Sequence, residues 1–132
     1  MATPSLLVVD DEPIVRESIR DWLQDAGYYV ATAENTEKAQ KLMDTQEFSV
    51  MVLDVNLPGK TGIDFFQEVK MQHPLAQAII MTADPSLETF QRVRELGNID
   101  CLIKPIAPKE LEQLIRKIIP STEQAPVANS PR

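Results

Sequence analysis

One stretch of this chain constrains its fold more than any other. It covers residues 51–59 and reads Met-Val-Leu-Asp-Val-Asn-Leu-Pro-Gly. A short apolar run that stops at a Pro-Gly turn is typical of a strand buried on both faces. The run ends in Asp54, which is therefore expected where the strand leaves the core and meets solvent. An ionised carboxylate at that position needs a compensating partner, because the loss of water disfavours its charged form.

Three further apolar runs also end in polar groups, and the two that end in Asp10-Asp11 and in Lys104-Pro105 are the places where this compensation is expected. They are residues 6–9 before Asp10 and Asp11, residues 78–81 before Thr82 and Ala83, and residues 101–103 before Lys104 and Pro105. Four apolar runs thus deliver acids, a hydroxyl and a lysine at their carboxyl ends. In open parallel sheets, ligands bind at this edge.

Helical patterns separate the strands along the whole chain. Strands are expected at residues 6–9, 29–33, 49–53, 77–81 and 100–103. Helices are expected to begin at Pro13, at Asn35 or Thr36, at Gly62, at Pro85 and Ser86, and at Pro108. The fourth helix is predicted to direct Leu87, Phe90 and Val93 inward. The alternation predicts an α/β protein whose parallel sheet is doubly wound, with helices on both faces.

The composition narrows the class of protein further. The chain has 132 residues, enough for one domain, and a formal net charge of -7, which argues against direct nucleic-acid binding. Cys101 is the only cysteine, so an internal disulfide is excluded. No apolar run reaches membrane-spanning length and no signal peptide is visible. These features predict a soluble cytoplasmic protein.

The apolar periodicity stops after Ile119. Residues 120–132 are rich in Pro, Ser and other polar residues, which predicts a flexible tail or the start of a linker. The predicted domain therefore covers residues 1–119.

The residues at the strand ends suggest a chemistry if they meet at one crevice. Clustered carboxylates such as Asp10, Asp11 and Asp54 repel one another and titrate together. A hard divalent cation with oxygen ligands relieves this repulsion, and Mg²⁺ commonly uses one or two carboxylates with waters and a phosphate. Lys104 and Thr82 add a cation and a hydroxyl donor for an anionic group. This set suits phosphoryl transfer, in which catalysis is mostly positioning and charge stabilisation.

The order of these features resembles the receiver domain of two-component response regulators. The matching residues are Asp10-Asp11 after the first strand, Asp54 after the third, Thr82-Ala83 after the fourth and Lys104-Pro105 after the fifth. The resemblance covers about residues 5–119. It implies the flavodoxin-like receiver fold, with five parallel strands in the order 2-1-3-4-5 and five helices.

The resemblance also implies a phosphoacceptor and a metal site. Asp54 would accept a phosphoryl group from a histidine of a sensor kinase or phosphotransfer protein. Mg²⁺, with Mn²⁺ as an alternative, would bind the carboxylates of Asp11 and Asp54 and the backbone carbonyl of Asn56. Asp10 would act mainly through a metal-bound water.

The remaining matched residues would respond to the phosphoryl group. Lys104 would pair with its oxygens, and the peptide bond to Pro105 would be cis. Thr82 would move to hydrogen-bond the phosphoryl group and would shift the loop that begins at Ala83. This movement would remodel the face formed by the fourth helix, fifth strand and fifth helix.

That face would serve an output domain, a downstream protein or a phosphorylation-dependent dimer. Such a domain is not an enzyme with a separate substrate, although it assists its own phosphorylation and dephosphorylation. Neither nucleic acid nor membrane is an expected direct partner.

One position departs from the family pattern. Receivers commonly carry Tyr or Phe three residues before the lysine, where this chain has Cys101. A cysteine has no ring to turn inward, which predicts a muted or differently routed switch.

Two alternatives stay open at this point. One is a pseudo-receiver that acts as an interaction module. The other is an aspartyl-phosphate phosphatase similar to haloacid-dehalogenase-like hydrolases. Those hydrolases carry a second aspartate two residues after the nucleophile, where this chain has Asn56, and this difference disfavours the second alternative.

Overall fold

Strands and helices alternate along the chain, as the sequence predicted. The computed structural model describes residues 4–83, 86–97 and 99–119. The strands are β1 (Ser5–Val9), β2 (Tyr29–Ala33), β3 (Val50–Asp54), β4 (Ala78–Thr82) and β5 (Ile99–Ile103). The helices are α1 (Pro13–Asp25), α2 (Thr36–Thr45), α3 (Gly62–Gln72), α4 (Leu87–Leu96) and α5 (Pro108–Ile118). Within the described ranges, no helix is both long enough and apolar enough to cross a membrane.

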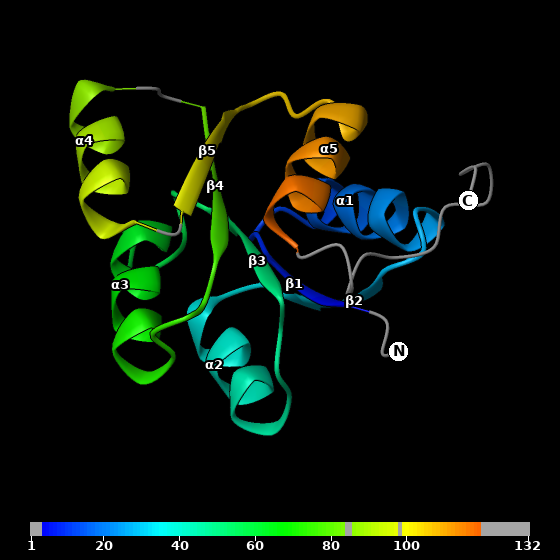
Figure 1. Cartoon of the computed structure of the whole chain (residues 1–132), viewed down its shortest axis with the longest axis horizontal. Helices are drawn as coiled ribbons and strands as arrows, with labels where there is room; N and C mark the ends of the chain where they lie inside the picture. Colours follow the sequence, from blue (N-terminus) through cyan, green and yellow to red (C-terminus); the bar gives the residue numbers. More distant parts are fainter. Residues whose placement is uncertain (1–3, 84–85, 98, 120–132) are drawn as a thin grey trace.

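The five strands form one sheet in the order β2-β1-β3-β4-β5, and all neighbouring pairs are parallel (Figure 1). This order confirms the predicted fold. The strands β1, β3 and β4 are buried almost throughout, because their runs are apolar on both faces. The more polar β2 lies at an edge.

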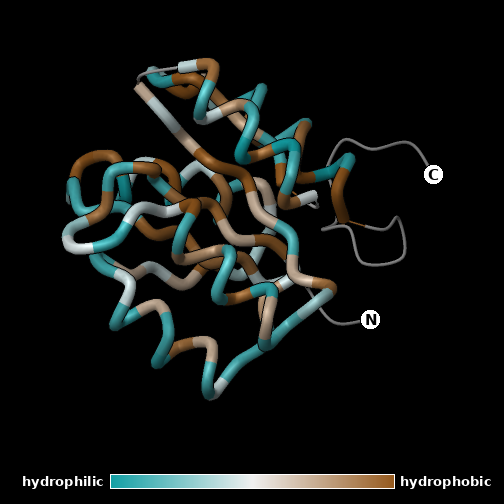
Figure 2. The backbone as a smooth tube through the Cα atoms, turned by 90° about the vertical axis from the view of Figure 1, so that its left-hand side faces the viewer, coloured by the Kyte–Doolittle hydropathy of each residue, from teal (hydrophilic) through white to brown (hydrophobic). Residues whose placement is uncertain are grey.

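Helices cover both faces of the sheet and divide the core in two (Figure 1). One buried cluster joins the sheet to α1 and α5, through residues such as Ile19, Leu23, Leu111 and Ile115. The other joins the sheet to α2, α3 and α4 and includes Phe66, one of the largest fully buried side chains. Figure 2 shows the hydrophobic residues concentrated on the strands, whereas hydrophobic and hydrophilic residues alternate along the helices.

The helix starts follow the local sequence signals. Asn35, Thr61 and Ser86 are N-caps whose side chains accept a hydrogen bond from the backbone N–H three residues later. The prolines Pro13 and Pro108 occupy the first turns of α1 and α5. Pro85, predicted to open the fourth helix, lies outside the described residues, as does the predicted tail at 120–132.

Two expectations about exposure are wrong. The strand β3 extends one residue further than predicted, so Asp54 belongs to it and is only 3% exposed instead of meeting solvent. In α4, Val93 is buried, whereas Leu87 is 73% and Phe90 36% exposed. The residues that α4 contributes to the core cluster, Val93 and Leu96, lie in its second half.

Candidate functional site

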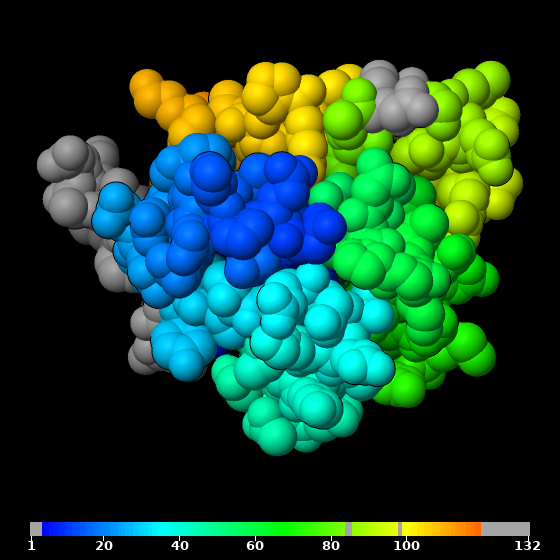
Figure 3. All heavy atoms as spheres, turned by 180° about the vertical axis from the view of Figure 1, so that it is seen from behind, coloured from blue at the N-terminus to red at the C-terminus, as the bar shows by residue number. Residues whose placement is uncertain are grey.

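Two buried carboxylates stand at the carboxyl ends of adjacent strands. Asp10 follows β1 directly and Asp54 is the last residue of β3. The two strands are paired up to Val9 and Leu53, so the following residues lie side by side. Seen from behind, the blue segment after β1 borders the green segment that leads from β3 into α3 (Figure 3). Asp10 is fully buried, and Asp54 is nearly so.

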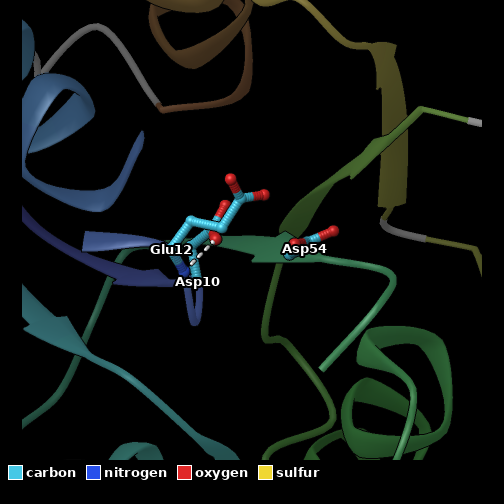
Figure 4. Close-up of side chains that lie close together, drawn as sticks. All are labelled: Asp10, Glu12 and Asp54. Carbon is cyan, nitrogen blue, oxygen red and sulfur yellow. Dashed lines mark hydrogen bonds between the residues drawn. The ribbon is translucent and has the colours of Figure 1, made fainter. Parts of the chain in front are cut away.

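A third carboxylate, which the sequence analysis missed, completes an acidic cluster. Oxygens of Asp10, Glu12 and Asp54 lie within 4.8 Å of one another (Figure 4). The Glu12 backbone N–H donates to Asp10 Oδ1 at 2.9 Å, which folds the chain back after β1 in an Asx-type turn. Asp11, the predicted metal ligand beside them, is exposed and does not belong to this cluster.

Lys104 supplies positive charge to the cluster from the far edge of the sheet. Its Nζ lies 3.1 Å from Asp54 Oδ2, 3.4 Å from Asp10 Oδ2 and 3.9 Å from Glu12 Oε1. The backbone N–H of Lys104 donates to the Thr82 carbonyl at 2.8 Å, which continues the pairing of β5 with β4 and sets the lysine beside the acids. The Lys104–Pro105 peptide bond is cis, as the resemblance predicted.

The electrostatics of Asp10 and Lys104 follow from this packing. Burial raises the pKa of Asp10 above its ordinary value, and the nearby charge of Asp54 adds to the effect. For Lys104, burial opposes the charged amine. The hydrogen bond to Asp54 and the charges of Asp10 and Asp54 together outweigh it, so the pKa of Lys104 is raised. The amine is therefore kept charged by its two acidic neighbours.

The segment after Asp54 is folded tightly against it. The Asn56 backbone N–H donates to Asp54 Oδ1 at 3.1 Å, while the Asn56 side chain is exposed. The Gly62 N–H donates to the Val55 carbonyl at 2.9 Å. A Cβ at Gly62 would lie 2.2 Å from the Asp54 carbonyl oxygen, so only glycine fits here. The start of α3 thus packs directly against the backbone of Asp54.

The remaining predicted residues occupy β4, β5 and the loop after β4. Thr82 ends β4 and is 1% exposed, whereas Ala83 is exposed. Cys101 of β5 is half-buried against the core cluster shared with α3 and α4. Burial raises the pKa of the Cys101 thiol, which disfavours its reactive thiolate.

The acidic cluster has a donor set that suits a hard cation. Three carboxylates face one lysine, so the group carries excess negative charge; Asp10 and Asp54 are buried, whereas Glu12 is exposed. Oxygen ligands of this kind are those that Mg²⁺ prefers. Within the described part of the chain, Asp10, Glu12 and Asp54 are the acidic residues grouped closely enough to hold such an ion.

The sequence as a whole matches a known family. A model of the response regulator receiver domain family matches residues 6–116. The chain belongs to this family. The match includes every strand end described above, from Asp10 to Lys104.

Two curated relatives illustrate the similarity of this receiver domain to bacterial regulators. It is 34% identical over 106 residues to the alginate biosynthesis transcriptional regulatory protein AlgB of Pseudomonas aeruginosa, which covers 80% of the chain and 24% of AlgB. It is 31% identical over 133 residues to the response regulator protein PilR of the same species, which covers 98% of the chain and 30% of PilR. The chain therefore spans only about a quarter to a third of the length of these relatives.

Solved structures agree with this assignment. The chemotaxis protein CheY4 of Vibrio cholerae superimposes on the receiver domain with a TM-score of 0.84 at 32% identity, over 89% of this chain and 100% of that chain. The BeF3-activated DrrB receiver domain has a TM-score of 0.78 at 27% identity, over 89% of this chain and 97% of that chain.

Proposed function

We propose that this receiver domain is a phosphorylation-dependent signalling switch and that Asp54 is its phosphoacceptor. The observation that carries the proposal is the convergence of Lys104, Asp10 and Glu12 on the Asp54 carboxylate, with the lysine amine 3.1 Å from Asp54 Oδ2. Three acids around one cation leave negative charge for a divalent cation to neutralise, and phosphoryl transfer depends on positioning and charge stabilisation of this kind.

The chemistry of the step falls to Asp54. An oxygen of its carboxylate forms a bond to phosphorus while the bond from phosphorus to a histidine nitrogen of the partner breaks. The leaving imidazole keeps the electron pair of the broken bond and takes up a proton from solvent. The hydrogen bond from the Asn56 N–H holds Oδ1 and orients the carboxylate before the attack.

Lys104 and Thr82 act on the product. Lys104 exchanges part of its contact with Asp54 for the phosphoryl oxygens, which carry about -1.5 to -2 charges at neutral pH. Thr82 ends the neighbouring strand and supplies a hydroxyl donor on the β4 side. Its response moves the loop at Ala83 and thereby the face of α4, β5 and α5.

A metal ion fits the same arrangement. Mg²⁺ or Mn²⁺ would be held by Asp10, Glu12 and Asp54, with Asp11 and the Asn56 carbonyl as further ligands once bound. Bound there, the ion would supply charge stabilisation for the transferred group. Asp10 and Glu12 keep the site negative enough to attract it.

The partners follow from this role. A sensor histidine kinase or phosphotransfer protein donates the phosphoryl group, and an output domain or downstream protein reads the α4–β5–α5 face. The domain assists its own phosphorylation and dephosphorylation in the cytoplasm and turns over no separate substrate.

Intact mass spectrometry tests the proposal. The wild type, Asp54→Ala and the matched control Asp44→Ala, which removes an exposed acid of α2, are incubated with acetyl phosphate, with and without Mg²⁺. We expect one phosphoryl adduct in the wild type and in Asp44→Ala. It should be absent from Asp54→Ala and from the metal-free samples.

Two outcomes would contradict the proposal. An adduct that persists in Asp54→Ala would place the phosphoacceptor elsewhere. No adduct with acetyl phosphate or with any histidine kinase would favour the pseudo-receiver, which should bind its partner equally well in the wild type and in Asp54→Ala.

A further inference from the structure

The guanidinium group of Arg16 contacts the backbone of the acidic cluster at Asp10. The proposed function gives this group no role. Arg16 stands in α1, and its Nη1 donates to the backbone carbonyl of Asp10 at 2.7 Å. The bond reaches back over the turn that carries Asp11 and Glu12. It therefore closes the β1–α1 turn from the helix side.

We propose that Arg16 is a positioning residue of the acidic site: its hydrogen bond to the Asp10 carbonyl fixes the turn that presents Asp10 and Glu12 to the phosphoacceptor. The role assigned to Arg16 rests on the proposed function, whereas its hydrogen bond to Asp10 is observed in the structure. Arg16 touches no reacting atom and acts only through Asp10.

The other contacts of Asp10 show what Arg16 adds. The Asp10 N–H donates to the Ala33 carbonyl at 3.2 Å, Oδ1 accepts from the Glu12 N–H, and Oδ2 accepts from Lys104. These three bonds hold the amide and the carboxylate. Arg16 donates to the carbonyl and thereby fixes the orientation of the peptide group that leads from Asp10 towards Glu12.

Burial makes this carbonyl sensitive to the loss of its partner. Asp10 is 0% exposed with Arg16 in place, and the guanidinium donates to its carbonyl from the helix side. An unsatisfied buried acceptor is costly, and a charged donor forms one of the stronger hydrogen bonds. Without Arg16 the carbonyl loses its charged donor, and a water in its place would hold the turn less firmly. We therefore expect the Glu12 carboxylate to lie less close to Asp54.

A competing explanation makes the opposite prediction. If Arg16 served only as a positive charge beside the acids, its removal would strengthen the attraction of a cation to the cluster. If Arg16 positions the turn, its removal disperses the ligands and weakens cation binding. Residues that orient metal ligands from behind typically change metal affinity by about 10- to 100-fold.

Mn²⁺ binding and amide hydrogen exchange test the proposal together. Arg16→Met removes the donor, whereas Arg16→Lys keeps the charge and one donor. Arg20→Met is the matched control one turn further along α1, where the arginine side chain donates to the exposed Asp21 of the same helix. Thermal unfolding verifies that each variant is folded.

We expect Arg16→Met to bind Mn²⁺ about tenfold more weakly than the wild type. In metal-free buffer, the Glu12 amide of this variant should exchange faster with solvent. Arg16→Lys should lie between these two proteins, and Arg20→Met should match the wild type in both measurements.

The result that overturns the proposal is an Arg16→Met variant that binds Mn²⁺ as tightly as the wild type or more tightly. Unchanged exchange of the Glu12 amide in Arg16→Met would overturn it as well. If Arg16→Met proved too unstable to measure, a Glu12 amide that exchanged in Arg16→Lys as slowly as in the wild type would have the same meaning. A wild type that takes no phosphoryl group would defeat the proposed function, yet the exchange comparison would still decide the role of Arg16.

Discussion

The two halves of the sheet are built differently. In the half formed by β1, β3 and β4, nearly every strand residue is buried, and the helix α3 above it buries both Phe65 and Phe66. In the half formed by β5 and α4, the strand is only partly covered, Ile103 is 51% exposed and Val93 is the one buried residue of the helix. The acids of the site stand on the first half, and the proposed output face belongs to the second.

In the half formed by β5 and α4, polar contacts supplement the limited apolar packing of α4. Lys70 of α3 donates from Nζ to the Leu96 carbonyl at 2.6 Å, at the C-terminal end of α4. Arg92 of α4 forms an ion pair with Asp64 of α3. Exposed ion pairs contribute little to stability, and water can replace them. The comparison teaches that Asp10 and Asp54 stand in a buried region, whereas α4 combines a small apolar contact with polar contacts that water can replace.

The largest expected effect is a loss of stability in the half formed by β1, β3 and β4, which α3 covers. Phe66→Ala removes a fully buried aromatic side chain and should lower the free energy of unfolding by about 3–5 kcal/mol. Phe90→Ala is its counterpart in α4, where the ring is already partly exposed, and should cost about 1 kcal/mol or less. Urea denaturation of both variants measures the contrast. Equal losses would show that α4 is packed as firmly as α3.

A smaller effect should come from Lys70→Met. This change removes the donor to the Leu96 carbonyl and should lower stability by about 0.5–1.5 kcal/mol. The amides of α4 should exchange faster with solvent, while those of β1 and β3 stay protected. The control is Lys41→Met, which changes an exposed lysine of α2. If α4 exchanged no faster in Lys70→Met than in this control, the polar contact would not hold the helix.

The smallest effect concerns the pH dependence of stability. Because the pKa of Asp10 is raised in the folded state, the native protein keeps this proton at a pH where the unfolded chain has lost it. The wild type therefore loses stability as the pH rises from near the ordinary value of 3.8 through the raised native pKa. Asp10→Asn lacks this loss, so its stability relative to the wild type should increase with pH.

Urea denaturation at several pH values between about 4 and 7, in metal-free buffer, measures this difference. A stability difference that stayed constant with pH, or fell as the pH rose, would contradict the assigned direction of the Asp10 shift. Asp44→Asn, at an exposed acid of α2, serves as the control.

The sequence predicts the site well where strands end in polar residues. Asp10, Asp54 and Lys104 were all identified because an abrupt change from apolar to charged residues marks a strand end, and parallel strands align their ends. Glu12 and Arg16 gave no such signal. Glu12 reaches the cluster only through a turn of particular shape, and Arg16 looks like any basic residue on the polar side of a helix.

Helix periodicity has a similar limit. It identifies Leu87 and Phe90 as members of one apolar stripe, but it does not show how much of the helix lies over the core. That extent depends on where α4 sits relative to β5, which is a property of the assembled structure. Burial of the Asp54 carboxylate was missed for a related reason, because a strand can extend by one residue without a change in its pattern.

The contact between Gly62 and Asp54 limits how this domain can be re-engineered. Residues 55–61 begin directly after Asp54 and lead to Gly62, which packs against the Asp54 backbone. A transplanted loop of different length is therefore expected to displace the start of α3 from the sheet. Substitutions at exposed positions such as Asn56 and Pro58 leave that closure untouched. A designer who wishes to alter partner choice near Asp54, the proposed phosphoacceptor, should therefore vary these side chains and keep both the length of the span and its terminal glycine.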